Sequence, residues 1–136
     1  MSHQDVILII EDNPDDIYLL KESFKYLDSP AHLEFFDTGK DAMLFLTQGN
    51  PLPSLLLLDL NLPDTDGREI LVQIKKDPNL RKIPVVIFST SNSPKDIEFC
   101  LSNYANSYIV KPLEFGELIR ILKTTFSYWL EINSMV

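Results

Sequence analysis

The sequence lacks the features that mark disulfide-rich, membrane or secreted proteins, so a soluble globular domain is expected. Its single cysteine, Cys100, has no partner for an internal disulfide, which fits a reducing compartment and predicts a cytoplasmic protein. No apolar run approaches the roughly 20 residues that span a bilayer. The N-terminus MSHQDVILII has no basic stretch before its apolar run, so no signal peptide is expected. Membrane and secreted classes are therefore disfavoured.

Basic residues are also in the minority, with 12 Lys and Arg against 20 Asp and Glu and a net charge of −8. This balance argues against a nucleic-acid-binding surface, which needs clustered cations. The length of 136 residues suits one domain with one core. We therefore expect a single domain over residues 1–136. The chain beyond the last predicted helix, about six residues, is too short for a DNA-binding output domain.

Short apolar runs alternate along the chain with segments of helical spacing. Strands are predicted at Val6–Ile10, His32–Phe36, 55–59, Val85–Ser89 and 108–110. Helices are predicted to begin near Asn13-Pro14, Thr38, Asp66, Ser93-Pro94 and Glu114, the last one ending near Leu130. Because the strands are continuously apolar, the alternation predicts a parallel α/β sheet covered on both faces, doubly wound with right-handed crossovers.

Charged and polar side chains follow the predicted strands where each one ends. Glu11 and Asp12 follow the first strand, Asp59 ends the third, Ser89 ends the fourth and Lys111 follows the fifth. The carboxyl ends of parallel strands meet at one edge of a sheet, where ligands of open α/β sheets bind. The sequence therefore predicts three carboxylates, a hydroxyl and an ammonium in one crevice.

This set of groups is typical of a site for a hard cation and a phosphoryl group. Three carboxylates raise one another's pKa unless a cation lies among them. Mg²⁺ takes oxygen ligands and offsets the charge of a phosphoryl group. The Ser89 hydroxyl and the Lys111 ammonium can each bind a phosphoryl oxygen. Asp59, central in the sheet, is the expected nucleophile.

Four motifs together resemble the response-regulator receiver domain of two-component signalling: EDNPDD, LLLLDLNLPDTDG, VVIFSTS and YIVKP. The resemblance covers essentially the whole chain, in order and spacing. It implies a flavodoxin-like, doubly wound, five-stranded parallel sheet with strand order 2-1-3-4-5 and five helices. It also implies a phosphorylation-driven protein–protein switch that catalyses its own phosphorylation and slow dephosphorylation but is not a turnover enzyme.

The resemblance also assigns a metal site and a phosphoacceptor. It implies that Asp59 accepts phosphate from a sensor histidine kinase. It implies that Asp12 and Asp59 are direct Mg²⁺ ligands, with the backbone carbonyl of Asn61 beside them and Glu11 acting through water. As a hypothesis, Asn61 and Ser91, each two residues after a site residue, tune the lifetime of the phosphate.

The remaining implied roles concern switching. Ser89 stands at the position of the switch hydroxyl, Tyr108 at that of the aromatic switch residue, and Lys111 at that of the phosphate-binding lysine. The Lys111-Pro112 peptide bond is expected to be cis. Phosphate at Asp59 is expected to draw Ser89 inward and let Tyr108 rotate inward, which reshapes the face of the fourth helix, fifth strand and fifth helix.

Within the family, NPDD, LPDTDGREIL and ANSYIVKP look most like the stand-alone regulators paired with phytochromes. That likeness implies a phytochrome as the partner kinase and a homodimer through the face of the fourth helix, fifth strand and fifth helix. No nucleic-acid or membrane partner is expected. The tail fits such an interface or seals the core, through Phe126, Tyr128, Trp129, Leu130 and Ile132.

Three other functions have to be weighed: a phosphatase, an adaptor and a flavin-binding protein. A haloacid-dehalogenase-like phosphatase would carry its Asp-x-Asp motif on the first strand. Here Asp59 and Asn61 follow the third strand, and Asn61 cannot donate a proton as a general acid. A receiver-fold adaptor that needs no phosphate would have lost Asp59, Asp12 or Lys111, and all three are present. Flavin binding would need a Ser-, Thr- and Gly-rich loop after the first strand, where this chain has EDNPDD.

Overall fold

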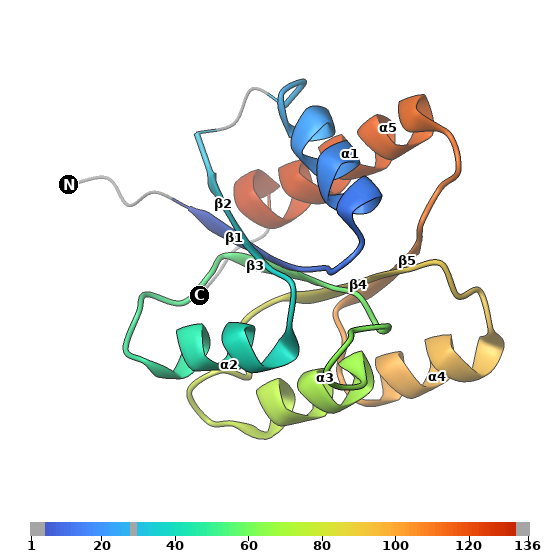
Figure 1. Ribbon diagram of the computed structural model, residues 1–136. Coiled ribbons are helices and arrows are strands. Elements are labelled where there is room, and N and C mark those ends of the chain that lie inside the picture. The colour runs from blue at the N-terminus through green and yellow to red at the C-terminus, as the bar shows by residue number, and fades with distance from the viewer. Residues whose placement is uncertain (1–4, 28–29, 133–136) are drawn as a thin grey trace.

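The computed structural model describes residues 5–27 and 30–132 and shows five parallel strands in one sheet (Figure 1). The strands are β1 (Val6–Ile10), β2 (His32–Phe36), β3 (Leu55–Leu58), β4 (Val85–Ser89) and β5 (Ser107–Val110). Their order across the sheet is β2-β1-β3-β4-β5. This is the strand order that the resemblance to receiver domains implies, and the chain is the doubly wound α/β fold that the alternation of strands and helices predicts.

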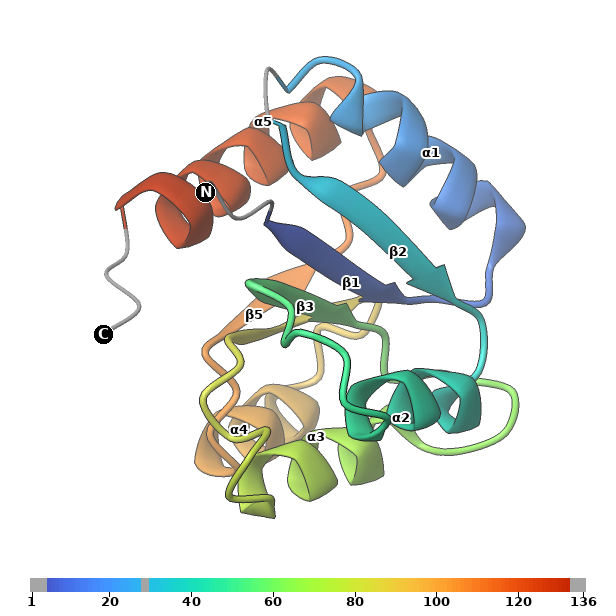
Figure 2. The same cartoon turned by 90° about the vertical axis from the view of Figure 1, so that its left-hand side faces the viewer.

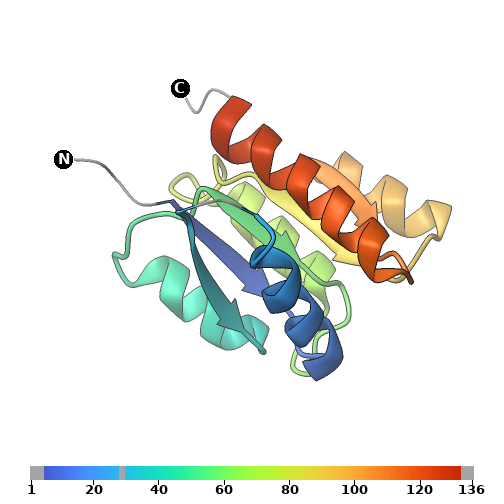
Figure 3. The same cartoon turned by 90° about the horizontal axis from the view of Figure 1, so that it is seen from above.

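Five α-helices cover both faces of the sheet. They are α1 (Pro14–Phe24), α2 (Gly39–Thr47), α3 (Gly67–Lys76), α4 (Pro94–Ser102) and α5 (Phe115–Phe126). Helices α1 and α5 lie on one face, and α2, α3 and α4 lie on the other (Figures 1, 2 and 3). No helix within the described ranges is long and apolar enough to cross a membrane.

The alternation of side chains along β1 divides the core into two layers. Ile7 and Ile9 pack in the cluster with α1 and α5, whereas Leu8 and Ile10 pack in the cluster with α2 and α3. All four residues of β3 are buried, so this central strand contributes to both layers. The most apolar strand of the chain therefore leads directly into Asp59, at the middle of the carboxyl edge.

Side-chain caps mark the starts of α1, α2 and α3 where the sequence predicts them. The Asn13 side chain accepts hydrogen bonds at the start of α1, and Asp66 accepts one at the start of α3. Asp64 caps a helix that is distant in sequence, because its carboxylate accepts from the backbone N–H groups of Gly39 and Lys40, both at 2.9 Å. These bonds lower the pKa of Asp64 and tie the loop after β3 to the N-terminus of α2.

Gly67 allows α3 to begin directly against the end of β3. Its N–H donates to the carbonyl of Leu60 at 2.8 Å. A Cβ at this position would collide with the Asp59 carbonyl oxygen and lie 2.6 Å from the Cα of Leu60. The absence of a side chain is therefore what lets the helix approach the backbone of Asp59.

The last helix differs from the prediction of one α-helix over residues 114–130. Helix α5 ends at Phe126 and continues as a π-helical segment, Ser127–Ile132. The change follows Thr124 and Thr125, whose hydroxyls donate to the carbonyls of Arg120 and Ile121. Such bonds compete with the helical ladder and favour bending.

The aromatic tail mainly closes the core. Phe126 is buried, and Trp129 and Leu130 pack against the same cluster. Tyr128 is 47% exposed and makes an edge contact with the Trp129 ring. The Ile132 side chain lies outside the described part of the chain. Among the aromatic and aliphatic tail side chains that the structure describes, Tyr128 is the one that is largely exposed.

Candidate functional site

The pairing of β1 with β3 brings the three predicted carboxylates together. Ile10 lies beside Leu58, and the N–H of Asp59 donates to the carbonyl of Ile10 at 3.1 Å. The residues that follow the two strands, Glu11, Asp12 and Asp59, thus share one edge. Their carboxylate oxygens lie within 4.8 Å of one another.

The pairing of β4 with β5 brings Lys111 to the same place. Its N–H donates to the carbonyl of Ser89 at 2.7 Å, which continues the ladder one residue beyond β5. The Lys111 ammonium then reaches Glu11 at 2.6 Å, Asp16 at 2.7 Å and Asp59 at 3.5 Å. Asp16, in the first turn of α1, is a contact that the sequence analysis did not predict.

The charges of this cluster are largely removed from water. The side chains of Glu11, Asp59 and Lys111 are 3%, 7% and 9% exposed. Burial raises the pKa of Glu11 to about 7, against the opposing effect of the Lys111 hydrogen bond. Burial alone would lower the pKa of Lys111, but its hydrogen bonds to Asp16 and Glu11 outweigh burial and raise it.

These residues fit a divalent cation. Three carboxylates contact the single Lys111 ammonium and a fourth, that of Asp12, lies beside two of them, so the cluster carries excess negative charge when all are ionised. Glu11, Asp12 and Asp59 offer three convergent oxygen ligands, the donor type that hard cations prefer. Burial raises the pKa of Glu11, so additional positive charge nearby would favour its ionised form.

Ser89, Ser91 and Tyr108 form a hydrogen-bonded chain at the end of β4. Ser89 is fully buried, and its Oγ accepts from the backbone N–H of Ser91 at 3.1 Å. The Tyr108 hydroxyl donates to the Ser91 carbonyl at 2.8 Å, and its ring packs against the core cluster of α3 and α4. The two predicted switch residues are thus joined through Ser91.

Asn61 lies beside the site, because its backbone N–H donates to Oδ1 of Asp59 at 3.4 Å. Its carbonyl as a metal ligand stays a prediction. The predicted cis bond is wrong: no peptide bond among residues 5–27 and 30–132 is cis, and Lys111-Pro112 is trans. The trans isomer is the more stable form of an X–Pro bond, and Lys111 reaches all its partners with it.

Comparison with known families assigns the chain to a family. Residues 7–123 match the response regulator receiver domain. The chain belongs to the response regulator receiver domain family. Members of this family act in two-component signalling, where they interact with histidine kinases, and they are generally not enzymes.

Relatives of this receiver chain occur in archaea and cyanobacteria. The probable methanogenesis regulatory protein FilR2 of Methanothrix harundinacea is 41% identical over 94% of this chain and 85% of its own length. The response regulator Rcp1 of Synechocystis is 38% identical over 93% of this chain and 89% of its own length. The chain is thus similar to stand-alone regulators, as its motifs indicate.

Solved structures agree with the fold. The phosphorylated cyanobacterial phytochrome response regulator RcpA superposes with a TM-score of 0.91 at 37% identity, covering 97% of this chain and 98% of its own. A Mn²⁺-bound form of Rcp1 superposes with a TM-score of 0.87 at 37% identity, covering 96% and 97%. A divalent metal in that relative is consistent with the carboxylate cluster here.

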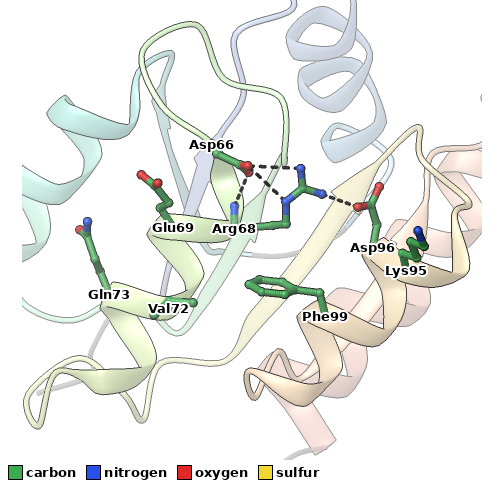
Figure 4. A pocket seen from close by; sticks show the side chains of 8 residues that line it. All are labelled: Asp66, Arg68, Glu69, Val72, Gln73, Lys95, Asp96 and Phe99. Atoms are coloured by element: carbon green, nitrogen blue, oxygen red, sulfur yellow. Dashed lines mark hydrogen bonds and ion pairs between the residues drawn. The ribbon is translucent and has the colours of Figure 1, made fainter.

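The receiver also has a groove of about 630 Å³ between α3 and α4 (Figure 4). Val72 and Phe99 line its apolar part, and Arg68 crosses it to form an ion pair with Asp96. The other Asp96 carboxylate oxygen accepts from the Ser91 hydroxyl at 2.6 Å. The groove is therefore joined to the Ser89–Tyr108 chain through Ser91. No sequence motif singled out Arg68 or Asp96.

Proposed function

We propose that Asp59 accepts a phosphoryl group from a sensor histidine kinase and that this modification switches a protein-interaction surface. The observation that carries the proposal is the position of the Asp59 carboxylate, nearly buried beside Asp12, Glu11 and Lys111. Burying a carboxylate at the end of an apolar strand is costly unless a cation or hydrogen bonds compensate its charge, and here a lysine faces it.

The chain's own residues support an in-line transfer. An Asp59 oxygen attacks the phosphorus of phosphohistidine. The new O–P bond forms as the P–N bond breaks, and the electron pair of that bond stays on the imidazole nitrogen. Lys111, which faces Asp59, would hold one phosphoryl oxygen, and the buried Ser89 hydroxyl would donate to another.

We propose Mg²⁺ as the metal. Asp12, Asp59 and the backbone carbonyl of Asn61 would hold it directly, with Glu11 acting through water. When bound, it offsets the charge of the carboxylates and of the phosphoryl group. The support from this chain is the convergence of three carboxylates and the raised pKa of Glu11.

We propose that the switch acts through the end of β4. A Ser89 hydroxyl drawn toward the phosphoryl group withdraws its oxygen from the N–H of Ser91. Ser91 also holds the Tyr108 hydroxyl and the Asp96 carboxylate, so the change reaches both β5 and α4. Asn61 and Ser91 are expected to set the lifetime of the phosphate.

We propose a phytochrome-type kinase as the phosphodonor, on the likeness to RcpA and Rcp1. A homodimer through the face of α4, β5 and α5 is proposed as the output, because Leu101, Tyr104 and Val110 are exposed there. The single free cysteine fits action in the cytoplasm.

Phosphate incorporation from acetyl phosphate, with and without Mg²⁺, tests the proposal. We expect Mg²⁺-dependent labelling that is lost in Asp59→Asn. It should persist in Asp64→Asn, because Asp64 binds the N-terminus of α2 and not the site. Wild-type protein that is folded and binds Mg²⁺ but takes no label would instead support a constitutive adaptor. Sizing chromatography of the same samples tests whether dimerisation follows phosphorylation.

A further inference from the structure

The Lys111 ammonium is shared unequally among its three carboxylate partners. It has three N–H donors, and its two short bonds go to Glu11 at 2.6 Å and Asp16 at 2.7 Å. The contact with Asp59, at 3.5 Å, is the longest of the three. Lys111 is therefore held mainly by the two residues that are not the phosphoacceptor.

The start of α1 commits the Asp16 carboxylate to this contact. Asn13 is the N-cap and accepts from the N–H groups of Asp15 and Asp16, which places Asp16 at the third helical position. An acidic side chain there commonly turns back to the N-cap N–H. Here the N–H of Asn13 donates to Glu11 instead, at 3.2 Å, so Asp16 is left to face Lys111.

The two short bonds differ in how easily they can be given up. The Glu11 side chain is 3% exposed, so water cannot readily replace Lys111 there. The Asp16 side chain is 29% exposed, so water can take over its hydrogen bond at a small cost. A phosphoryl group on Asp59 that needs Lys111 will therefore draw it from Asp16 and not from Glu11.

We propose that Asp16 is a positioning residue that holds the Lys111 ammonium in the unphosphorylated protein and competes with the phosphoryl group for it. This inference rests on the proposed phosphoryl transfer to Asp59. Asp16 lies outside the group of convergent carboxylates Glu11, Asp12 and Asp59, so its effect runs through Lys111 and not through the metal ligands. It biases the receiver toward the unphosphorylated state.

The test is the equilibrium affinity for beryllofluoride, a phosphoryl mimic, in the presence of Mg²⁺, measured by calorimetry. Asp16→Asn should bind about five-fold more tightly than wild type, because a competing ion pair is lost. Asp15→Asn is the matched control. It removes the same charge from the same helical turn, and the exposed Asp15 carboxylate makes no ion pair within the described part of the chain. Its affinity should stay within about two-fold of wild type.

Asp16→Glu should restore an affinity near that of wild type, because it keeps a carboxylate in reach of Lys111. Urea midpoints of all variants establish that they are folded. Equal affinities of Asp16→Asn and Asp15→Asn would overturn the inference, since the gain would then be a general charge effect. Weaker binding by Asp16→Asn would also overturn it. Wild-type protein that binds no beryllofluoride would contradict the proposed function itself, a separate outcome.

Discussion

Two partly buried lysines lie at opposite ends of the sheet, and their pKa values are shifted in opposite directions. At the carboxyl edge, Lys111 contacts the carboxylates of Glu11, Asp16 and Asp59. Burial opposes its charge, but the anionic hydrogen bonds raise its pKa. At the amino edge, burial lowers the pKa of Lys75, and no carboxylate opposes that effect in the described part of the chain.

Lys75, in the last turn of α3, has three neutral acceptors. They are the carbonyls of Arg81 at 3.1 Å and Ile83 at 2.8 Å, and Oδ1 of Asn106 at 3.0 Å. The same Asn106 oxygen also accepts from the N–H of Val85, the first residue of β4. Lys75 therefore joins the end of α3 to the starts of the last two strands.

The comparison shows that the charge of a lysine's hydrogen-bond partners distinguishes a structural lysine from a functional one in this fold. Neutral acceptors satisfy the hydrogen bonds of the Lys75 ammonium without adding negative charge, so no excess of carboxylates gathers around Lys75, among the residues described, to attract a metal ion. Around Lys111 the carboxylates outnumber the ammonium, which leaves a local negative charge that a divalent cation can offset. Replacing Lys75 should accordingly affect stability and not phosphoryl binding, whereas replacing Lys111 should affect phosphoryl binding.

Replacing Lys111 should have the largest effect on switching. Lys111→Met removes the cation that faces Asp59, so beryllofluoride affinity should fall by about 100-fold, the cost of losing one partner of a buried charge pair. Calorimetry with Mg²⁺ measures the loss. Lys75→Met is the control for removing a half-buried lysine and should bind within about two-fold of wild type. Similar losses in both variants would remove the distinction between the two edges.

A side chain at Gly67 should disturb the site edge through the backbone. In Gly67→Ala the new Cβ collides with Asp59 and Leu60, so we expect a loss of about 2–4 kcal/mol in the free energy of unfolding. Urea titration measures it. Gly116→Ala is the control: its Cβ would meet Glu114 Oε1 at 3.6 Å, an ordinary contact, and alanine favours the α5 helix. Equal stability of both variants would contradict the close approach at Gly67.

Replacing Lys75 should lower stability and leave the site intact. Lys75→Met leaves the carbonyls of Arg81 and Ile83 without this donor, and we expect a loss of about 1–3 kcal/mol in the free energy of unfolding. The control is Lys76→Met, at the exposed neighbouring position of the same helical turn. A variant Lys75→Met as stable as Lys76→Met would show that the neutral contacts contribute nothing.

Raising the pH should lower the free energy of unfolding of the metal-free protein, because Glu11 at the carboxyl edge becomes ionised. The pKa of Glu11 is raised in the folded state, from 4.5 to about 7, so the folded protein binds the proton more tightly than the unfolded chain does. Its stabilising contribution is complete below 4.5 and is lost as the pH rises through about 7. Unfolding in urea with a chelator should show this decline, and Glu11→Gln should flatten it.

The same titration should act in the opposite direction on metal affinity. The ionised Glu11 favours a cation, so Mg²⁺ affinity should rise by about ten-fold or less between pH 6 and pH 8. Calorimetric titration of wild type and Glu11→Gln measures the difference. A wild-type Mg²⁺ affinity that does not change with pH would show that ionisation of Glu11 does not contribute to metal binding.

Much of the fold follows from the sequence because its signals are local. The strand formed by Leu55–Leu58 is a continuous apolar run, and Asn13 and Asp66 are recognisable caps at the predicted helix starts. Strand order also fixes which strand ends are neighbours. The meeting of Glu11 and Asp59 with Lys111 is therefore predictable once the receiver order is assigned.

What the sequence does not predict depends on side chains meeting across distant segments. Asp15 and Asp16 are alike as acidic residues in a first helical turn, and only the position of β5 distinguishes the one that meets Lys111. The bonds from Gly39 and Lys40 to Asp64 cross 25 and 24 residues of sequence, and no local pattern encodes them. The isomer of an X–Pro bond is equally a matter of tertiary context.

The most direct test of the account is the location of the acyl phosphate. Protein incubated with acetyl phosphate and Mg²⁺ is reduced with borohydride, which converts an aspartyl phosphate to homoserine, and its peptides are sequenced by mass spectrometry. The account predicts homoserine at position 59, dependent on Mg²⁺ and absent without the phosphodonor. Homoserine in place of Asp12, Asp16 or another aspartate, with Asp59 unmodified, would contradict it.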